Sequence, residues 1–147
     1  MQMSARLQAL VAAAESGDAE AMTDLALVYA RGEELQRVDL PTAISWYWKA
    51  AVSGSYRAMG NLAYLYLNGI SVRKDPARAV ALYEEVVKGP SPDLEQYLYD
   101  LANCYELGVG VPPDMARAKS LYSKSAQLGS RLAQQALSRL KAMAVAA

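Results

Sequence analysis

Histidine is absent from the 147 residues of this chain, and cysteine occurs once, at Cys104. Without histidine the usual nucleophile–histidine pairs cannot form, and the commonest zinc ligand is missing. One cysteine cannot make an internal disulfide, which fits a reducing compartment. We therefore expect a protein that is not an enzyme, with no cofactor and no metal, located in the cytoplasm or, as the alternative, in the periplasm.

An excess of charge of one sign and long hydrophobic runs are missing as well. Fifteen basic residues balance fifteen acidic ones, so the chain has no basic field that would release counterions from a phosphate backbone. No apolar run approaches the roughly 20 residues of a membrane helix. Glycine and proline are sparse while 53% of residues are hydrophobic, as in packed, mostly helical domains. We expect neither nucleic acid binding nor membrane insertion.

What the chain does contain is an internal repeat with a period of 36 to 39 residues. A Leu-Ala-x-x-Tyr-x-x-Gly pattern starts at Leu25, Leu62 and Leu101, and an Asp-x-x-x-Ala pattern starts at Asp39, Asp75 and Asp114. Apolar residues at spacings of three and four predict two helices in each unit. The aspartates are preferred N-caps, and Pro76 suits a first helical position. Each unit closes on a glycine that we expect in the left-handed conformation: Gly54, Gly89 and Gly129.

The third unit, LANCYELGVGVPPDMARAKSLYSKSAQLG, closely resembles the Sel1-like repeat. The second unit has Ser71 in place of a glycine, and the first loop, EELQRV, has one extra residue. The resemblance implies an all-α fold, a right-handed α/α solenoid of about eight antiparallel helices, similar to tetratricopeptide arrays. The expected parts are an N-terminal capping helix (1–17), repeats at 19–54, 56–89 and 93–129, and a C-terminal capping helix (130–147). Three extra residues in KGPSPDLEQ (88–96) interrupt the register before the third repeat.

The N-terminal apolar stretch faintly resembles a signal peptide, but its register with the repeats favours the capping helix. The aromatic stretch WYWKAAVSG raises a second question. Trp46 and Tyr47 occupy packing positions of the repeat, so a structural role is expected. Trp48 aligns with polar residues, Glu84 and Ser123, and we therefore expect it to face solvent as a candidate contact residue. The alternative is that the N-terminal helix or the long first loop covers it.

By analogy with the family, the first helix of each repeat lines the concave, ligand-binding surface. Positions not used for packing are Asp24, Leu27, Arg31, Arg57, Asn61, Tyr64, Asn68, Gln96, Asp100 and Asn103. Amide and carboxyl side chains among them can hold the N–H groups of an extended peptide, and Tyr64 adds a flat apolar contact. The alternative is a solvated helix face without a ligand.

The expected function is that of a non-catalytic bacterial adaptor that binds a protein or peptide on its concave face; self-association is also compatible with the sequence. One variant of this function is a neutralising partner of a toxin or effector. The alternative class is a small enzyme or ligand-binding protein acting on cell-wall or β-lactam-like material. Cysteine-rich relatives suggest that association, but their disulfide pairs are missing here. Cys104 aligns with core positions and is expected to be a buried thiol.

Overall fold

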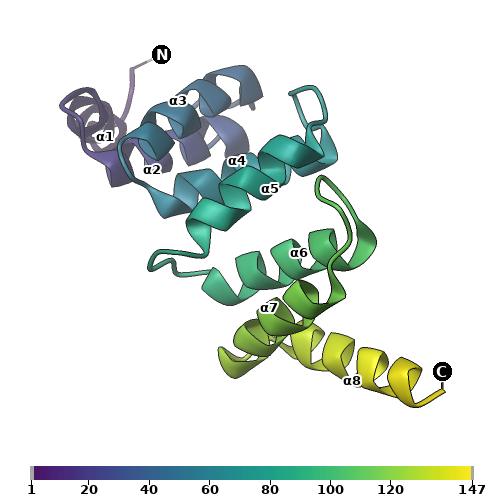
Figure 1. Ribbon diagram of the computed structural model, residues 1–147. Coiled ribbons are helices and arrows are strands. Elements are labelled where there is room, and N and C mark those ends of the chain that lie inside the picture. The colour runs from purple at the N-terminus through teal and green to yellow at the C-terminus, as the bar shows by residue number, and fades with distance from the viewer. Residues whose placement is uncertain (1, 147) are drawn as a thin grey trace.

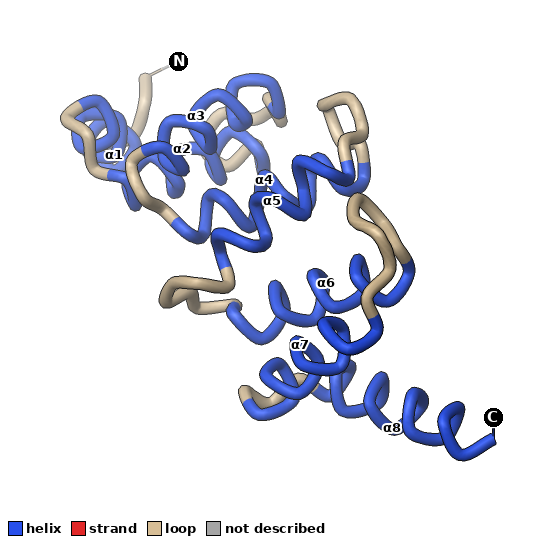
Figure 2. Tube along the Cα trace, in the orientation of Figure 1, coloured by secondary structure: helices blue, strands red, loops and turns tan. Residues whose placement is uncertain are grey.

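The computed structural model describes residues 2–146, which form eight helices and no strand (Figures 1 and 2). The helices are α1 (Ala5–Glu15), α2 (Ala19–Arg31), α3 (Leu40–Val52), α4 (Tyr56–Asn68), α5 (Pro76–Val86), α6 (Leu94–Leu107), α7 (Met115–Gln127) and α8 (Arg131–Ala146). They stack in chain order, and the two ends of the chain lie at opposite ends of the stack (Figure 1). The expected all-α solenoid is confirmed.

The second helix of each repeat begins at the aspartate that the sequence indicates. The carboxylates of Asp39, Asp75 and Asp114 each accept a hydrogen bond from the backbone N–H three residues later, at 3.0–3.1 Å. This satisfies an amide that has no partner within the helix. The first helices α2 and α4 are capped in the same way by Asp18 and Ser55, and so is α8, which stacks on α6 as a further first helix, by Ser130. The exception is α6, whose N-cap residue, Asp93, makes no such bond.

Gly89 does not have the role that the repeat pattern suggests. Its backbone lies outside the left-handed region that Gly54 and Gly129 adopt, so this part of the prediction is wrong. A Cβ at Gly89 would lie 2.1 Å from Cζ of Tyr56, because the Tyr56 ring packs directly on the backbone there. The Tyr56 ring therefore holds the connection between α5 and α6 against α4, and any side chain larger than that of glycine at position 89 would clash with it.

The packed interior consists of two clusters of buried side chains. One draws mainly on α1 to α4, and the other on α5 to α8 with Ala63 of α4. Tyr47 is 3% exposed and Cys104 2% exposed, which confirms that both are core residues. Each repeat thus packs against its neighbours rather than around one centre, as is usual in solenoids.

Trp48 is half-buried, so the expectation that it faces solvent is wrong. Its Nε1 donates a hydrogen bond to the hydroxyl of Tyr66 at 3.2 Å, and the two rings meet edge to face with centroids 6.0 Å apart. One repeat later Glu84 makes the equivalent contact, accepting from the hydroxyl of Tyr105 at 2.6 Å. The position that aligns as polar therefore joins α3 and α5, the second helices of the first two repeats, to the tyrosine of the following repeat.

Candidate functional site

A groove opens between α4 and α6. Its larger part has a volume of about 610 Å³ and is lined by Gly60, Asn61, Tyr64, Leu67, Asn68, Tyr83, Asp93, Glu95, Gln96, Tyr97 and Asp100. A smaller part of about 270 Å³ shares Leu67 and Asp100 with it and adds Lys74, Asn103, Cys104, Leu107 and Val109. Six of the ten positions predicted for binding, Asn61, Tyr64, Asn68, Gln96, Asp100 and Asn103, are brought together here.

The size of Tyr97 explains why the groove lies between these two helices. In the first two repeats the equivalent positions are Ala21 and Ala58, both buried, and small side chains there let helices approach closely. Tyr97 places an aromatic ring at this position instead. The ring packs directly on the backbone of Gly60, where an added Cβ would lie only 2.3 Å from Cζ of Tyr97. The ring of an aromatic residue therefore fills the space between α4 and α6, and the longer connection before α6 accommodates the change.

Asp100 is a half-buried carboxylate of this groove. Its Oδ1 accepts a hydrogen bond from Nε2 of Gln96 at 2.9 Å, and its Oδ2 accepts a longer one from the hydroxyl of Tyr83 at 3.5 Å. Burial raises the pKa of the Asp100 carboxyl, and these two hydrogen bonds partly offset the rise. None of the ion pairs among residues 2–146 includes Asp100. The carboxylate is therefore partly shielded from water, and its hydrogen-bond partners within the chain are neutral.

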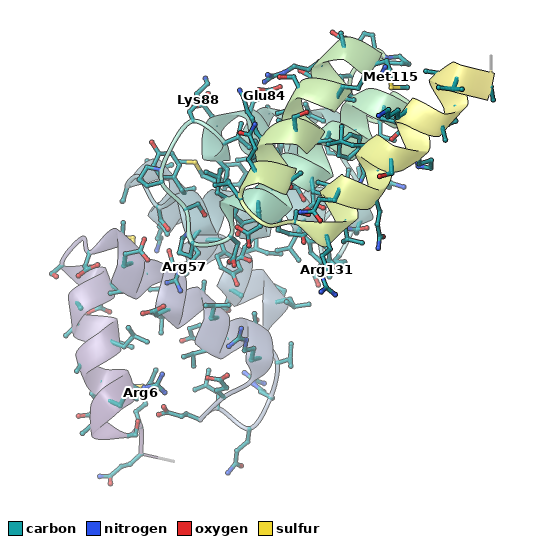
Figure 3. All side chains as sticks on the ribbon, turned by 90° about the horizontal axis from the view of Figure 1, so that it is seen from below. Arg6, Arg57, Glu84, Lys88, Met115 and Arg131 are labelled. Atoms are coloured by element: carbon teal, nitrogen blue, oxygen red, sulfur yellow. The ribbon has the colours of Figure 1, made fainter. Side chains whose placement is uncertain are left out.

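The other two junctions between first helices are closed by arginines. Arg57 of α4, labelled in Figure 3, contacts Asp24 of α2 at 2.6 Å and Glu20 at 3.1 Å. Arg139 of α8 makes two hydrogen bonds to Glu106 of α6, at 2.9 and 2.7 Å. Within the described chain no ion pair joins α4 to α6, which leaves the middle junction open.

Four predicted positions therefore lie outside the groove. Asp24 and Arg57 bind each other. Leu27 is half-buried and packs against the N-terminal core, so its placement on a free surface is wrong. Arg31 is exposed and lies 3.6 Å from Glu33.

Several lining residues were missed by reasoning from the sequence, namely Gly60, Leu67, Tyr83, Asp93, Glu95 and Tyr97. Gly60 and Tyr97 carry a signal that the repeat alignment shows: a glycine inside a helix, and a tyrosine where other repeats have alanine. The inserted segment before α6 likewise marks Asp93. Tyr83 carries no comparable signal, because it occupies the ordinary packing position of the repeat and only its hydroxyl reaches Asp100.

Cys104 lines the smaller part of the groove. Burial, with a smaller contribution from Asp100, raises the pKa of the Cys104 thiol to about 11, so the nucleophilic thiolate is scarce at neutral pH. Among residues 2–146 no group of three or more acidic or cysteine side chains is arranged to hold a metal ion. Over the same residues, none of the helices combines the length and apolar character needed to span a bilayer.

The family model of the Sel1 repeat matches residues 19–55, 57–85 and 96–130. The chain belongs to the Sel1 repeat family. Sel1 repeats commonly mediate protein–protein interactions, and members of the family are generally non-enzymatic scaffolds. This gives the coarse class of activity.

Solved structures of bacterial proteins show the same fold. A Sel1 repeat protein of Oxalobacter formigenes is 33% identical with a TM-score of 0.81; the match covers 91% of this chain and 98% of that one. The protective antigen c5321 of uropathogenic Escherichia coli, which displays an SLR fold, is 27% identical with a TM-score of 0.84. That match covers 95% of this Sel1 repeat chain but 29% of c5321.

A more distant structure, cysteine rich protein B of Helicobacter pylori, is 21% identical with a TM-score of 0.65. The match covers 89% of this chain and 91% of that one, and shows the shared fold. No curated protein matches the sequence.

Proposed function

We propose that this Sel1 repeat protein is a non-catalytic adaptor that holds an extended segment of a protein partner in the groove between α4 and α6. The observation that carries the proposal is that polar side chains from two different repeats line one cavity of about 610 Å³. A solvated helix face would present the same residues without a shared hollow. In the groove these side chains face one hollow, so a single bound segment would contact all of them.

The lining of the groove suits a peptide backbone. Asn61, Asn68 and Gln96 carry amides that both donate and accept hydrogen bonds, as peptide groups do. Asn68 uses one donor on the carbonyl of Tyr64, at 2.9 Å, which orients its side chain along α4. Tyr64 is 54% exposed and offers a flat apolar surface with a polar tip, a combination common in protein interfaces.

Photo-crosslinking tests where the partner binds. The photoreactive amino acid p-benzoylphenylalanine is placed at Tyr64 in one variant and, as a matched control, at Val52 of α3 in another. Val52 is 85% exposed and lies outside the groove. After irradiation in cells, mass spectrometry should identify one partner segment cross-linked from position 64 and not from position 52.

A second variant checks that the cross-link depends on the groove. Asn61→Ala with Gln96→Ala, added to the photoreactive protein, removes amides from both walls and should abolish the product from position 64. Glu15→Ala, at an exposed site of α1, is the control and should leave it unchanged. Equal products from positions 64 and 52, or a product indifferent to the loss of both amides, would show that the groove is not the binding surface.

A further inference from the structure

The two closed junctions between first helices show how this chain satisfies its carboxylates. At α2–α4 the guanidinium of Arg57 lies against Asp24, and at α6–α8 that of Arg139 lies against Glu106. The α4–α6 junction also has a carboxylate, Asp100, but its partners are an amide and a phenol. A guanidinium is therefore missing at this junction alone among the three in the described chain.

The charge of the larger cavity is complementary to a cation. Its ionisable lining includes the carboxyls of Asp93, Glu95 and Asp100, and none of its described lining residues is lysine or arginine. Lys74 lines the smaller cavity, which Asp100 also borders and whose other lining is mainly apolar. A positively charged side chain entering the larger cavity would meet acceptors on the α6 side and no like charge.

The rings of the groove favour arginine over lysine. Tyr64 and Tyr97 line the same cavity as Asp100, and a planar guanidinium can lie on a ring while two of its N–H groups point to one carboxylate. The chain makes ring contacts of this kind itself: the guanidinium of Arg78 lies 5.1 Å from the ring centre of Tyr66. Each oxygen of Asp100 accepts one hydrogen bond and keeps capacity for a second.

We propose that the partner segment held in the groove carries an arginine whose guanidinium binds the carboxylate of Asp100 and packs on the ring of Tyr64. This inference rests on the proposed adaptor function and names the side chain that the groove selects. The partner's arginine would complete at α4–α6 the contact that the protein's own arginines make at the two neighbouring junctions.

The probe is an acetylated Gly-Ser-Arg-Ser-Gly amide, titrated into the full ¹⁵N-labelled chain and followed by NMR. The comparison peptide has citrulline in place of arginine, which keeps the shape and removes the charge. We expect the arginine peptide to shift the side-chain amide signals of Asn61 and Gln96. Its affinity should exceed that of the citrulline peptide by about tenfold or more, because a hydrogen bond to a charged group contributes roughly 1.5–3 kcal/mol.

Two substitutions with opposite expected effects on the preference for arginine locate the interaction. Asp100→Asn keeps the shape and removes the charge: its amide oxygen can accept from Gln96, and its NH2 group can donate to the hydroxyl of Tyr83. The arginine and citrulline peptides should then bind this variant with nearly equal affinity. Asn61→Asp adds a carboxylate to the facing wall and should increase that preference. Glu15→Gln, on α1, should leave it unchanged, and the melting temperature of each variant shows that it is folded.

Equal affinity for the two peptides, no binding of the arginine peptide, or shifts confined to residues outside the groove would each overturn the arginine site. The adaptor function is judged separately by the cross-link from position 64. A cross-linked partner segment without arginine, retained by Asp100→Asn, would refute this inference and leave the adaptor function intact. Selective binding of the arginine peptide, together with no cross-linked partner from position 64, would support the arginine site and refute the adaptor function.

Discussion

One methyl group at position 60 tests the contact that shapes the groove. In Gly60→Ala the new Cβ would lie 2.3 Å from Cζ and 2.5 Å from Cε1 of Tyr97, whose ring is only 8% exposed and has little room to move. Alanine in a helix interior normally gains about 1 kcal/mol over glycine, whereas an extra methyl group in a packed region costs about 1–3 kcal/mol. We expect a net loss of stability of up to about 2 kcal/mol.

The assay is urea unfolding followed by circular dichroism for wild type, Gly60→Ala, Tyr97→Ala and the double variant. Without the Tyr97 ring the same methyl group has no obstacle and should stabilise the helix by about 1 kcal/mol, so the sign of its effect reverses. Ala81→Gly, at an exposed site of α5, measures the propensity difference on this scaffold. If Gly60→Ala is more stable than wild type by about 1 kcal/mol while Tyr97 is present, the full helix-propensity gain is realised and the close contact does not exist.

Three further measurements address the packing and the ionisable groups. Trp48→Ala should lower the free energy of unfolding by about 2–3 kcal/mol, less than the roughly 3–5 kcal/mol of a fully buried tryptophan. The control Val52→Ala, at a position 85% exposed, should change it by less than about 0.5 kcal/mol. Similar urea midpoints for the two variants would show that Trp48 is not packed. The hydrogen bond from Arg139 lowers the pKa of Glu106, so this carboxylate stabilises the fold above its unfolded pKa, and the contribution is lost as pH falls through the folded value. Arg139→Met should therefore flatten the decrease of the urea midpoint on acidification below about pH 4.5, and an unchanged pH profile would contradict that contact. Iodoacetamide should alkylate Cys104, 2% exposed, at the rate of unfolding; rapid alkylation of the native protein at pH 7.5 would show an accessible thiolate.

The features predicted well from the sequence are those with a local cause. The caps at Asp39, Asp75 and Asp114 depend on a carboxylate and an amide three residues apart, so the repeat register was enough to find them. The burial of Tyr47 follows in the same way from helical spacing. Such features need no knowledge of how neighbouring repeats are placed.

The features predicted poorly depend on contacts between repeats. The polar equivalents of Trp48 suggest exposure, yet one of them, Glu84, is itself a contact residue that accepts a hydrogen bond from the next repeat. Arg57 was assigned to a binding surface because nothing in one helix reveals that Asp24 of another lies 2.6 Å away. Six of the ten predicted positions lie in the groove because helical spacing gives their face. The depth of the groove depends on Tyr97, which is not among those ten.

The register break before α6 makes the groove a transferable part of the scaffold. The changes that accompany the groove are confined to one junction: a longer connection, a tyrosine for an alanine, and the glycine that faces it. Since each repeat packs mainly on its immediate neighbours, the same three changes can be installed at another junction without altering the rest of the stack. An array of such repeats could then carry recognition sites at chosen intervals, spaced by whole repeats, along one continuous chain.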